Sequence, residues 1–150
     1  MTAKEELSQY NDAQGRVEET LEEYRKYKER ATKMTAIISD MPMNHGKSDK
    51  VGDNAIAMAD INKEYLDRWI DAEKKRLYIT SRIDVIQNKL YRDVLKGKYV
   101  EGLKLEEIAC NIKYSYDRVK HIHGEALEEY RIYWGLEKEK KNKVSTKTHF

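Results

Sequence analysis

The sequence predicts an all-α protein in which a long antiparallel helical hairpin precedes a C-terminal helix-turn-helix. The chain has one proline and seven glycines among 150 residues, which leaves few turns and favours long helices. Charged residues make up 37% against about 25% in an average domain. Two segments also repeat apolar residues at alternating spacings of three and four, and a third has the buried positions of a helix-turn-helix. We therefore expect narrow apolar stripes rather than one large core.

The first helix is predicted from Thr2 to residue 38. Thr2 and Glu5 have the spacing of a capping box, which satisfies free amide groups at a helix start. Gly15 costs about 1 kcal/mol relative to alanine in a helix, so the helix is expected to fray or to begin late there. The predicted stripe consists of Leu7, Tyr10, Gln14, Val17, Leu21, Tyr24, Lys28, Ala31, Thr35 and Ile38.

The second helix is predicted over residues 58–90, with the same alternation of spacings. Its polar positions, Asn62 and Arg76, weaken the seam and are expected to set its register and partner number. Trp69 falls on the seam and is therefore expected to be structural. The stripe consists of Met58, Asn62, Tyr65, Trp69, Ala72, Arg76, Ile79, Ile83, Ile86 and Leu90.

A loop is predicted between these helices, over residues 39–54, because this segment holds the only proline and two of the glycines. Folding back at this loop makes an antiparallel, coiled-coil-like hairpin over residues 1–88, with helices ~50 Å long. The seams can pair within one chain or between two. We favour a homodimer or higher homo-oligomer, because two narrow stripes alone bury little surface. The acidic residues and histidine of the loop match no known ligand spacing, so no metal site is predicted.

A helix-turn-helix domain is predicted over residues 89–135. Counting from Leu105, a small residue at the fifth position lets two helices approach closely, and Ser115 is placed to cap the second helix. The turn residue, usually a glycine in left-handed backbone, is Lys113. A supporting helix is expected over residues 90–100, and Gly135 is expected to end the last helix. The predicted core positions are Leu105, Ile108, Ala109, Ile112, Val119 and Ile122.

Several functional classes have no support in the sequence. It has no glycine-rich phosphate loop, nucleophile elbow or metalloprotease motif, so neither enzymatic activity nor a cofactor is predicted. The single cysteine, Cys110, argues against disulfides and zinc fingers and is expected to be a packing residue. No apolar run reaches the ~18 residues of a membrane span. We expect a cytoplasmic protein with no membrane partner, and a basic, disordered tail over residues 136–150.

The stretch from Tyr91 to Leu127 resembles the promoter-reading C-terminal domain of the major bacterial sigma factors. It resembles phage and prophage regulators of the RinA and ArpU type more closely. Those regulators also have a helical N-terminal half, and the run Met-Pro-Met-Asn-His-Gly-Lys-Ser-Asp-Lys-Val-Gly is similar to a stretch in the same position there. The resemblance implies a sigma-region-4-like helix-turn-helix that binds double-stranded DNA. It also implies an activator of phage late or packaging genes in a bacterial host cell, acting with host RNA polymerase.

The predicted recognition helix covers residues 115–130, and its early outward-facing residues would reach base edges in the major groove. Arg118 suits guanine or phosphate, Asp117 suits the amino group of cytosine, and Lys120 suits phosphate. Residues 89–120 carry eight basic and five acidic side chains, whereas residues 1–39 carry seven and eight. Positive charge is thus biased toward the predicted DNA-binding half. The candidate DNA-binding residues are Ser115, Tyr116, Asp117, Arg118, Lys120 and His121.

Two other functions remain open on the sequence alone. The small subunit of a phage terminase also combines a helix-turn-helix with oligomerising helices, although it usually places the DNA-binding unit first. A coiled-coil adaptor that binds protein instead of DNA would have the same helical pattern.

Overall fold

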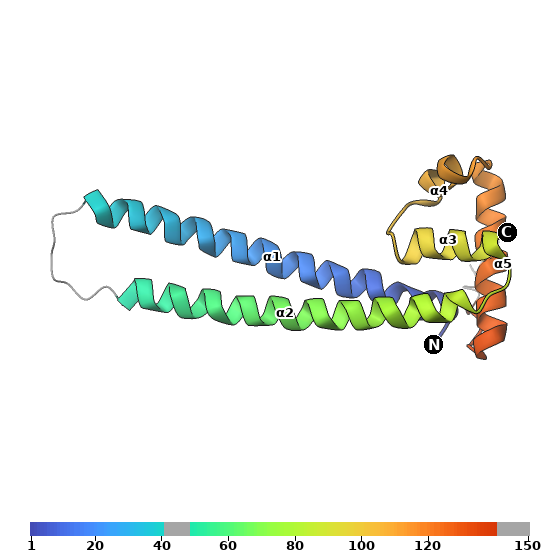
Figure 1. Ribbon diagram of the computed structural model, residues 1–150, viewed down its shortest axis with the longest axis horizontal. Helices are drawn as coiled ribbons and strands as arrows, with labels where there is room; N and C mark the ends of the chain where they lie inside the picture. Colours follow the sequence, from blue (N-terminus) through green and yellow to red (C-terminus); the bar gives the residue numbers. More distant parts are fainter. Residues whose placement is uncertain (41–48, 141–150) are drawn as a thin grey trace, which may run out of the picture. The chain divides into compact units, whose positions relative to one another are not determined.

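The computed structural model describes residues 1–40 and 49–140, and these residues form five α-helices and no strand (Figure 1). The helices are α1 (Ala3–Asp40), α2 (Asp49–Asp84), α3 (Lys89–Tyr99), α4 (Leu105–Ile112) and α5 (Tyr116–Trp134). The predicted all-α class is therefore confirmed for the described chain. Its contacts divide it into two units, one of Gln9–Ile79 and one of Met1–Ser8 with Thr80–Phe150.

In the unit Gln9–Ile79, α1 and α2 pack side by side and run in opposite directions (Figure 1). Ala13 and Val17 of α1 are buried against Ala72 of α2. Further along α1, the Arg68 guanidinium of α2 donates a 2.7 Å hydrogen bond to the hydroxyl of Thr20, which is fully buried. Contacts later in α1 thus fall earlier in α2, as antiparallel helices require.

The predicted stripes are right at many positions and one residue off at others. The predicted positions that are buried are Leu7, Val17, Ala72, Ile79, Ile83 and Ile86. Ala13 and Thr20 are buried in α1, whereas their predicted neighbours Gln14 and Leu21 are only half-buried. In α2, Ile61 is buried, whereas Asn62 and Trp69 are exposed. At Leu21 and Trp69 the predicted stripe followed large apolar side chains, whereas the seam accepts a hydrogen-bonded threonine. At Gln14 and Asn62 the regular spacing of three and four passed over the buried neighbours Ala13 and Ile61. Thr35 and Ile38 have side chains outside the described residues.

The helices also begin and end differently from the prediction. α1 passes through Gly15 without a break, and Asp40 and Asp49 belong to helices rather than to the predicted loop 39–54. Residues 41–48 lie outside the described residues. The second stripe does not continue as one helix to Leu90, because α2 ends at Asp84 and the Asn88 side chain caps a new helix, α3. The boundary between the two contact units falls inside α2, after Ile79, whereas the sequence predicted a domain boundary at residue 88.

In the other unit, α3, α4 and α5 pack around one apolar cluster. Its buried members are Val94, Ile108, Ala109, Val119 and Ile122, with Leu105 and Ile112 half-buried against them. A Cβ atom built on Gly97 of α3 would lie 3.1 Å from two side-chain atoms of Ile108. This close approach of α3 to α4 explains why α3 has a glycine in its interior, where glycine otherwise weakens a helix.

A buried polar cluster joins the N-terminal and C-terminal segments of this unit. Tyr130 of α5 is fully buried and donates a 2.6 Å hydrogen bond to the Glu6 carboxylate. Arg82 forms an ion pair with Glu6 at 3.3 Å, and its guanidinium lies 3.8 Å from the centre of the Trp134 ring. Each buried charge thereby has an opposite charge or a hydrogen bond, which removes most of the cost of burying it.

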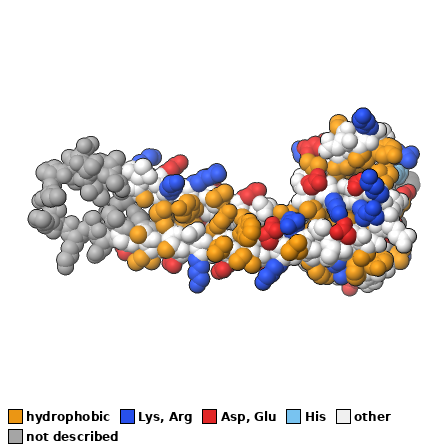
Figure 2. Space-filling model, viewed as in Figure 1, with side chains coloured by type: hydrophobic (Ala, Val, Ile, Leu, Met, Phe, Trp, Pro, Cys, Tyr) orange, Lys and Arg blue, Asp and Glu red, His pale blue; other side chains and the backbone are white. Residues whose placement is uncertain are grey.

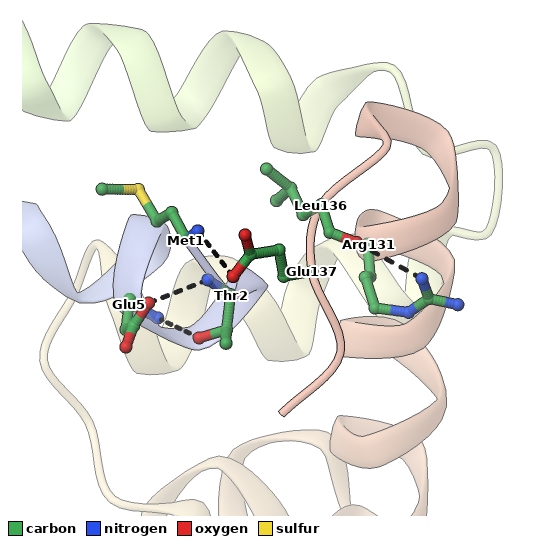
Figure 3. Close-up of polar contacts among 6 residues, drawn as sticks. All are labelled: Met1, Thr2, Glu5, Arg131, Leu136 and Glu137. Atoms are coloured by element: carbon green, nitrogen blue, oxygen red, sulfur yellow. Dashed lines mark hydrogen bonds and ion pairs between the residues drawn. The ribbon is translucent and has the colours of Figure 1, made fainter. Parts of the chain in front are cut away.

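The two ends of the described chain also meet in this unit (Figure 3). Thr2 and Glu5 form the predicted capping box, with backbone-to-side-chain distances of 2.8 and 3.2 Å. The Met1 ammonium lies 3.3 Å from the carboxylate of Glu137, whose amide donates to the Met1 carbonyl. Residues 136 and 137 were predicted to begin a disordered tail, but Glu137 is held against the N-terminus and Leu136 is hydrogen-bonded to Arg131. Residues 141–150 lie outside the described residues.

Candidate nucleic-acid interface

The turn between α4 and α5 has the predicted local geometry. Lys113 adopts left-handed backbone, with φ 60° and ψ 40°, and the Tyr114 amide donates a 3.1 Å hydrogen bond to the Ala109 carbonyl. The Ser115 side chain then accepts a 3.3 Å hydrogen bond from the Arg118 amide and caps α5. The turn that separates the two helices is therefore only Lys113, Tyr114 and Ser115.

α5 separates its buried and exposed residues sharply in its first two turns. Val119 and Ile122 face the apolar cluster and are 0% and 6% exposed. The six candidate residues Ser115, Tyr116, Asp117, Arg118, Lys120 and His121 are all exposed. The structure thus brings the six predicted side chains together on the surface of one helix start.

Two aromatic rings support the basic side chains of this surface. The Arg118 guanidinium lies 5.0 Å from the centre of the Tyr114 ring, and the Lys120 ammonium lies 4.6 Å from that of Tyr116. Both pairs are four residues apart and lie within cation–π range. Tyr114 is not among the six candidate residues predicted from the sequence. The spacing of a tyrosine four residues before an arginine is the signal that could have found it.

Asp117 changes the electrostatics of the same surface. Its carboxylate lies 3.3 Å from the Lys120 ammonium, and the Asp117 side chain is 86% exposed. An ion pair this exposed contributes little to stability. It does orient Lys120 and leaves the outer oxygen atoms of Asp117 accessible to a hydrogen-bond donor.

The second half of α5 differs in charge from the first. A shallow groove there is lined by Gly124, Ile132 and three glutamates, together with Tyr91 of α3, which donates a 2.8 Å hydrogen bond to Glu125. The glutamates are Glu125, Glu128 and Glu129. This half would repel a phosphate backbone. The one basic side chain in this half, Arg131, is paired with Glu128 at 2.6 Å, so the half keeps a net negative charge.

Gly124 lies in open space. A Cβ atom built there would have no neighbour within 4 Å, so no surface within the described chain approaches its backbone closely.

His123 lies on the side of α5 that faces α3. Its Nε2 atom is 2.8 Å from the Tyr99 hydroxyl, and the two rings stack at 5.7 Å. Burial, together with the positive charges of Lys98 and Lys4, lowers the pKa of His123 from 6.5 to about 4. The imidazole is neutral at pH 7 and holds α3 against α5.

Cys110 was expected to be a packing residue, but its side chain is exposed on α4. The apolar cluster takes Ile108 and Ala109 from the same helix, and Cys110 follows them on a different face. Nothing in the described environment of Cys110 gives it a packing role.

Within residues 1–40 and 49–140, no group of three or more histidine, cysteine or acidic side chains is arranged to hold a metal ion. His45, which the sequence placed in the loop, lies outside this range. Among the described helices, none is both long and apolar enough to cross a membrane. Comparisons with protein-family models, with curated proteins and with solved structures found no match to this chain.

Proposed function

We propose that the chain is a sequence-specific DNA-binding transcription regulator. In this proposal α4 and α5 form a sigma-region-4-like helix-turn-helix, and the paired helices form a hairpin that holds copies of the chain together. The single observation that carries the proposal is the start of α5, where six polar or charged side chains are exposed while Val119 and Ile122 fix the opposite face in a core. A helix of this kind fits the major groove of DNA.

The exposed residues divide into two roles. Arg118 and Asp117 stand at the start of the helix, where recognition helices contact base edges, and they suit guanine and cytosine respectively. Lys120 and the Ser115 hydroxyl suit phosphate oxygens, which fix the position of the helix without reading sequence. Tyr116 and His121 flank these groups and are suited to either role. In this arrangement the tyrosine rings under Arg118 and Lys120 limit the conformations of both basic side chains before DNA binds.

The charge distribution supports a specific rather than a general DNA-binding role. The surplus over residues 89–120 is three positive charges, and the glutamates of the second half of α5 exclude phosphate there. Few phosphate contacts give weak nonspecific binding and a shallow dependence on salt. Affinity for an operator would then depend on base contacts and on a second DNA-binding unit in an oligomer. Host RNA polymerase and phage late genes enter this proposal only through the resemblance to RinA- and ArpU-type regulators.

Selection from random double-stranded DNA tests the proposal. The full chain is incubated with a pool of random duplexes, bound DNA is recovered and sequenced, and the recovered duplexes are tested by gel shift against competitor DNA. We expect one enriched sequence motif, with two copies if the protein binds as a dimer. A pool that remains random after repeated rounds would contradict the proposal and favour the adaptor function. A closed ring of many subunits in solution would favour the terminase function instead.

A further inference from the structure

α2 has a second apolar surface, formed by Leu66, Trp69, Ile70 and Leu77, which we call the outer face of α2. These side chains are 54%, 47%, 40% and 59% exposed. Positions 66, 70 and 77 fall on one side of a helix, with position 69 beside them. Large apolar side chains that gather on one face of a helix mark an interaction surface, whereas single exposed ones do not.

The outer face of α2 is separate from the seam with α1. The seam uses Ala72 and Tyr65, which pack against Ala13 and Val17. Outer-face residues and seam residues alternate along the sequence of α2 because they lie on different sides of the helix. α1 covers the seam side and leaves the outer face of α2 uncovered. Figure 2 shows hydrophobic side chains on the surface of the described part of this pair of helices.

We propose that the outer face of α2 binds the same face of a second copy of this chain, with the two α2 helices antiparallel. The two-fold axis would cross the outer face of α2 midway between Leu66 and Leu77. Leu66 of each copy would then contact Leu77 of the other copy. The proposal goes beyond DNA binding and does not depend on it.

The charges beside the outer face of α2 favour a second copy over a different partner. Asp67 and Lys74 are both exposed, and they lie on the same flank of the helix, seven residues apart. In an antiparallel pair the same flanks of both helices meet, so Asp67 of each copy faces Lys74 of the other. A surface that is complementary to itself in this way is the property that a symmetric dimer requires.

The opposite flank has the same self-complementarity. Trp69 and Arg76 lie there, and the antiparallel arrangement brings each indole ring near the Arg76 guanidinium of the other copy. Arg76 is half-buried and is held by Glu73 at 3.0 Å, so its side chain is already oriented along the helix. A guanidinium over an indole ring is a favourable cation–π contact.

Sedimentation velocity of the full chain without DNA, over a wide range of concentrations, tests this face directly. The wild type is expected to form a dimer, and the double variant Leu66→Glu, Leu77→Glu is expected to raise its dissociation constant by at least about tenfold. The matched control is Ile132→Glu, which places the same charge on an exposed apolar position of α5 and is expected to leave the dimer intact. Circular dichroism of each variant verifies that the helices remain folded.

A charge exchange tests the antiparallel register. Asp67→Lys alone and Lys74→Asp alone each place like charges opposite one another and weaken the dimer. The double variant Asp67→Lys, Lys74→Asp restores it. A monomeric wild type, or a dimer that is indifferent to the leucine substitutions, would overturn the proposed face. Failure of the double exchange to restore the dimer would overturn the antiparallel arrangement. Because no DNA is present, these results test the dimer alone, and the DNA contacts proposed for α5 are tested separately by the selection from random duplexes.

Discussion

At the scale of single residues, Lys113 is the position where sequence and backbone disagree most. It holds left-handed backbone with φ 60°, which costs a residue with a Cβ atom about 1–2 kcal/mol and costs glycine almost nothing. Lys113→Gly is therefore expected to raise the free energy of unfolding by about 0.5–1 kcal/mol, after the greater freedom of glycine in the unfolded chain is counted. Urea denaturation measures the difference.

The control for this substitution is Asp93→Gly, at an exposed position of α3 with ordinary helical backbone. Glycine there lowers the free energy of unfolding by about 0.5 kcal/mol, because it weakens a helix interior. A Lys113→Gly variant that loses as much stability as Asp93→Gly would show that the turn does not have left-handed backbone in solution.

His123 makes stability depend on pH. Its pKa is about 4 in the folded chain and 6.5 when unfolded, so between these values the unfolded chain binds more protons. The free energy of unfolding therefore falls as the pH is lowered from 6.5 to 4. The ring is partly exposed, so we expect a loss of about 2 kcal/mol, less than the full shift would give. Thermal melts across this pH range measure it.

Replacing His123 with glutamine isolates its contribution, because the amide still accepts a hydrogen bond from Tyr99 and does not titrate. His123→Gln is expected to have a shallower pH dependence than the wild type over this range. His121→Gln, the same change at the exposed histidine of α5, is expected to leave the pH dependence of the free energy of unfolding unchanged. Equal slopes for the wild type and His123→Gln would contradict the buried, neutral state of His123.

At the scale of helices, Gly97 sets how closely α3 and α4 approach. Gly97→Val would force side-chain carbon atoms into Ile108, since even a Cβ atom there would lie 3.1 Å from it. We expect a loss of about 1–3 kcal/mol in the free energy of unfolding, typical of an overfilled core. The same substitution at Gly124, where no atom lies within 4 Å, is expected to change stability by less than about 0.5 kcal/mol. Similar losses for both variants would contradict the close packing.

Three helix ends were predictable because their causes are local. The capping box at Thr2, the N-cap at Ser115 and the end of α5 at Gly135 each depend on residues within one turn, and the structure has all three. The left-handed backbone at Lys113 was predictable for the same reason. The short connection between the two helices requires this backbone conformation, whichever type of residue occupies the turn position.

The seam between α1 and α2 was predictable only in part. Periodicity identified a stripe on each helix but could not choose between Thr20 and Leu21, or between Arg68 and Trp69, because apolarity favoured the wrong one of each pair. The hydrogen bond between Arg68 and Thr20 makes the polar choice stable, and it joins residues 48 apart in the sequence. Contacts at that separation leave no periodic pattern in the sequence.

At the scale of the whole chain, the sequence predicted the number and order of its main helices but not how they divide into units. The expected boundary followed the end of the second stripe at residue 88. In the structure the boundary lies within α2, and residues 1–8 group with the C-terminal helices. The cause is the contact of Glu6 with Arg82 and Tyr130. This contact links residues 124 apart in sequence, so local pattern cannot reveal it.

The candidate DNA-binding residues were predictable as a group because the apolar positions of α5 fix which side faces outward. Their roles on DNA stay a prediction, since the charges of a helix surface do not identify its partner. The paired rings beneath Arg118 and Lys120 show how a short helix start can present two oriented cations. Phosphate contacts and guanine contacts both require exposed cations at a defined spacing. Substitution of Arg118 or of Lys120 therefore tests the DNA contact proposed for that residue.

The most direct test of the regulator function is the affinity of Arg118→Ala for the selected DNA duplex across a series of salt concentrations. The control is Arg30→Ala, since Arg30 of α1 is also exposed and also lies over a tyrosine ring, at 5.8 Å. We predict that Arg118→Ala weakens specific binding by about 1–3 kcal/mol, while Arg30→Ala binds like the wild type. Equal affinities for Arg118→Ala and the wild type at every salt concentration would contradict the placement of α5 on DNA.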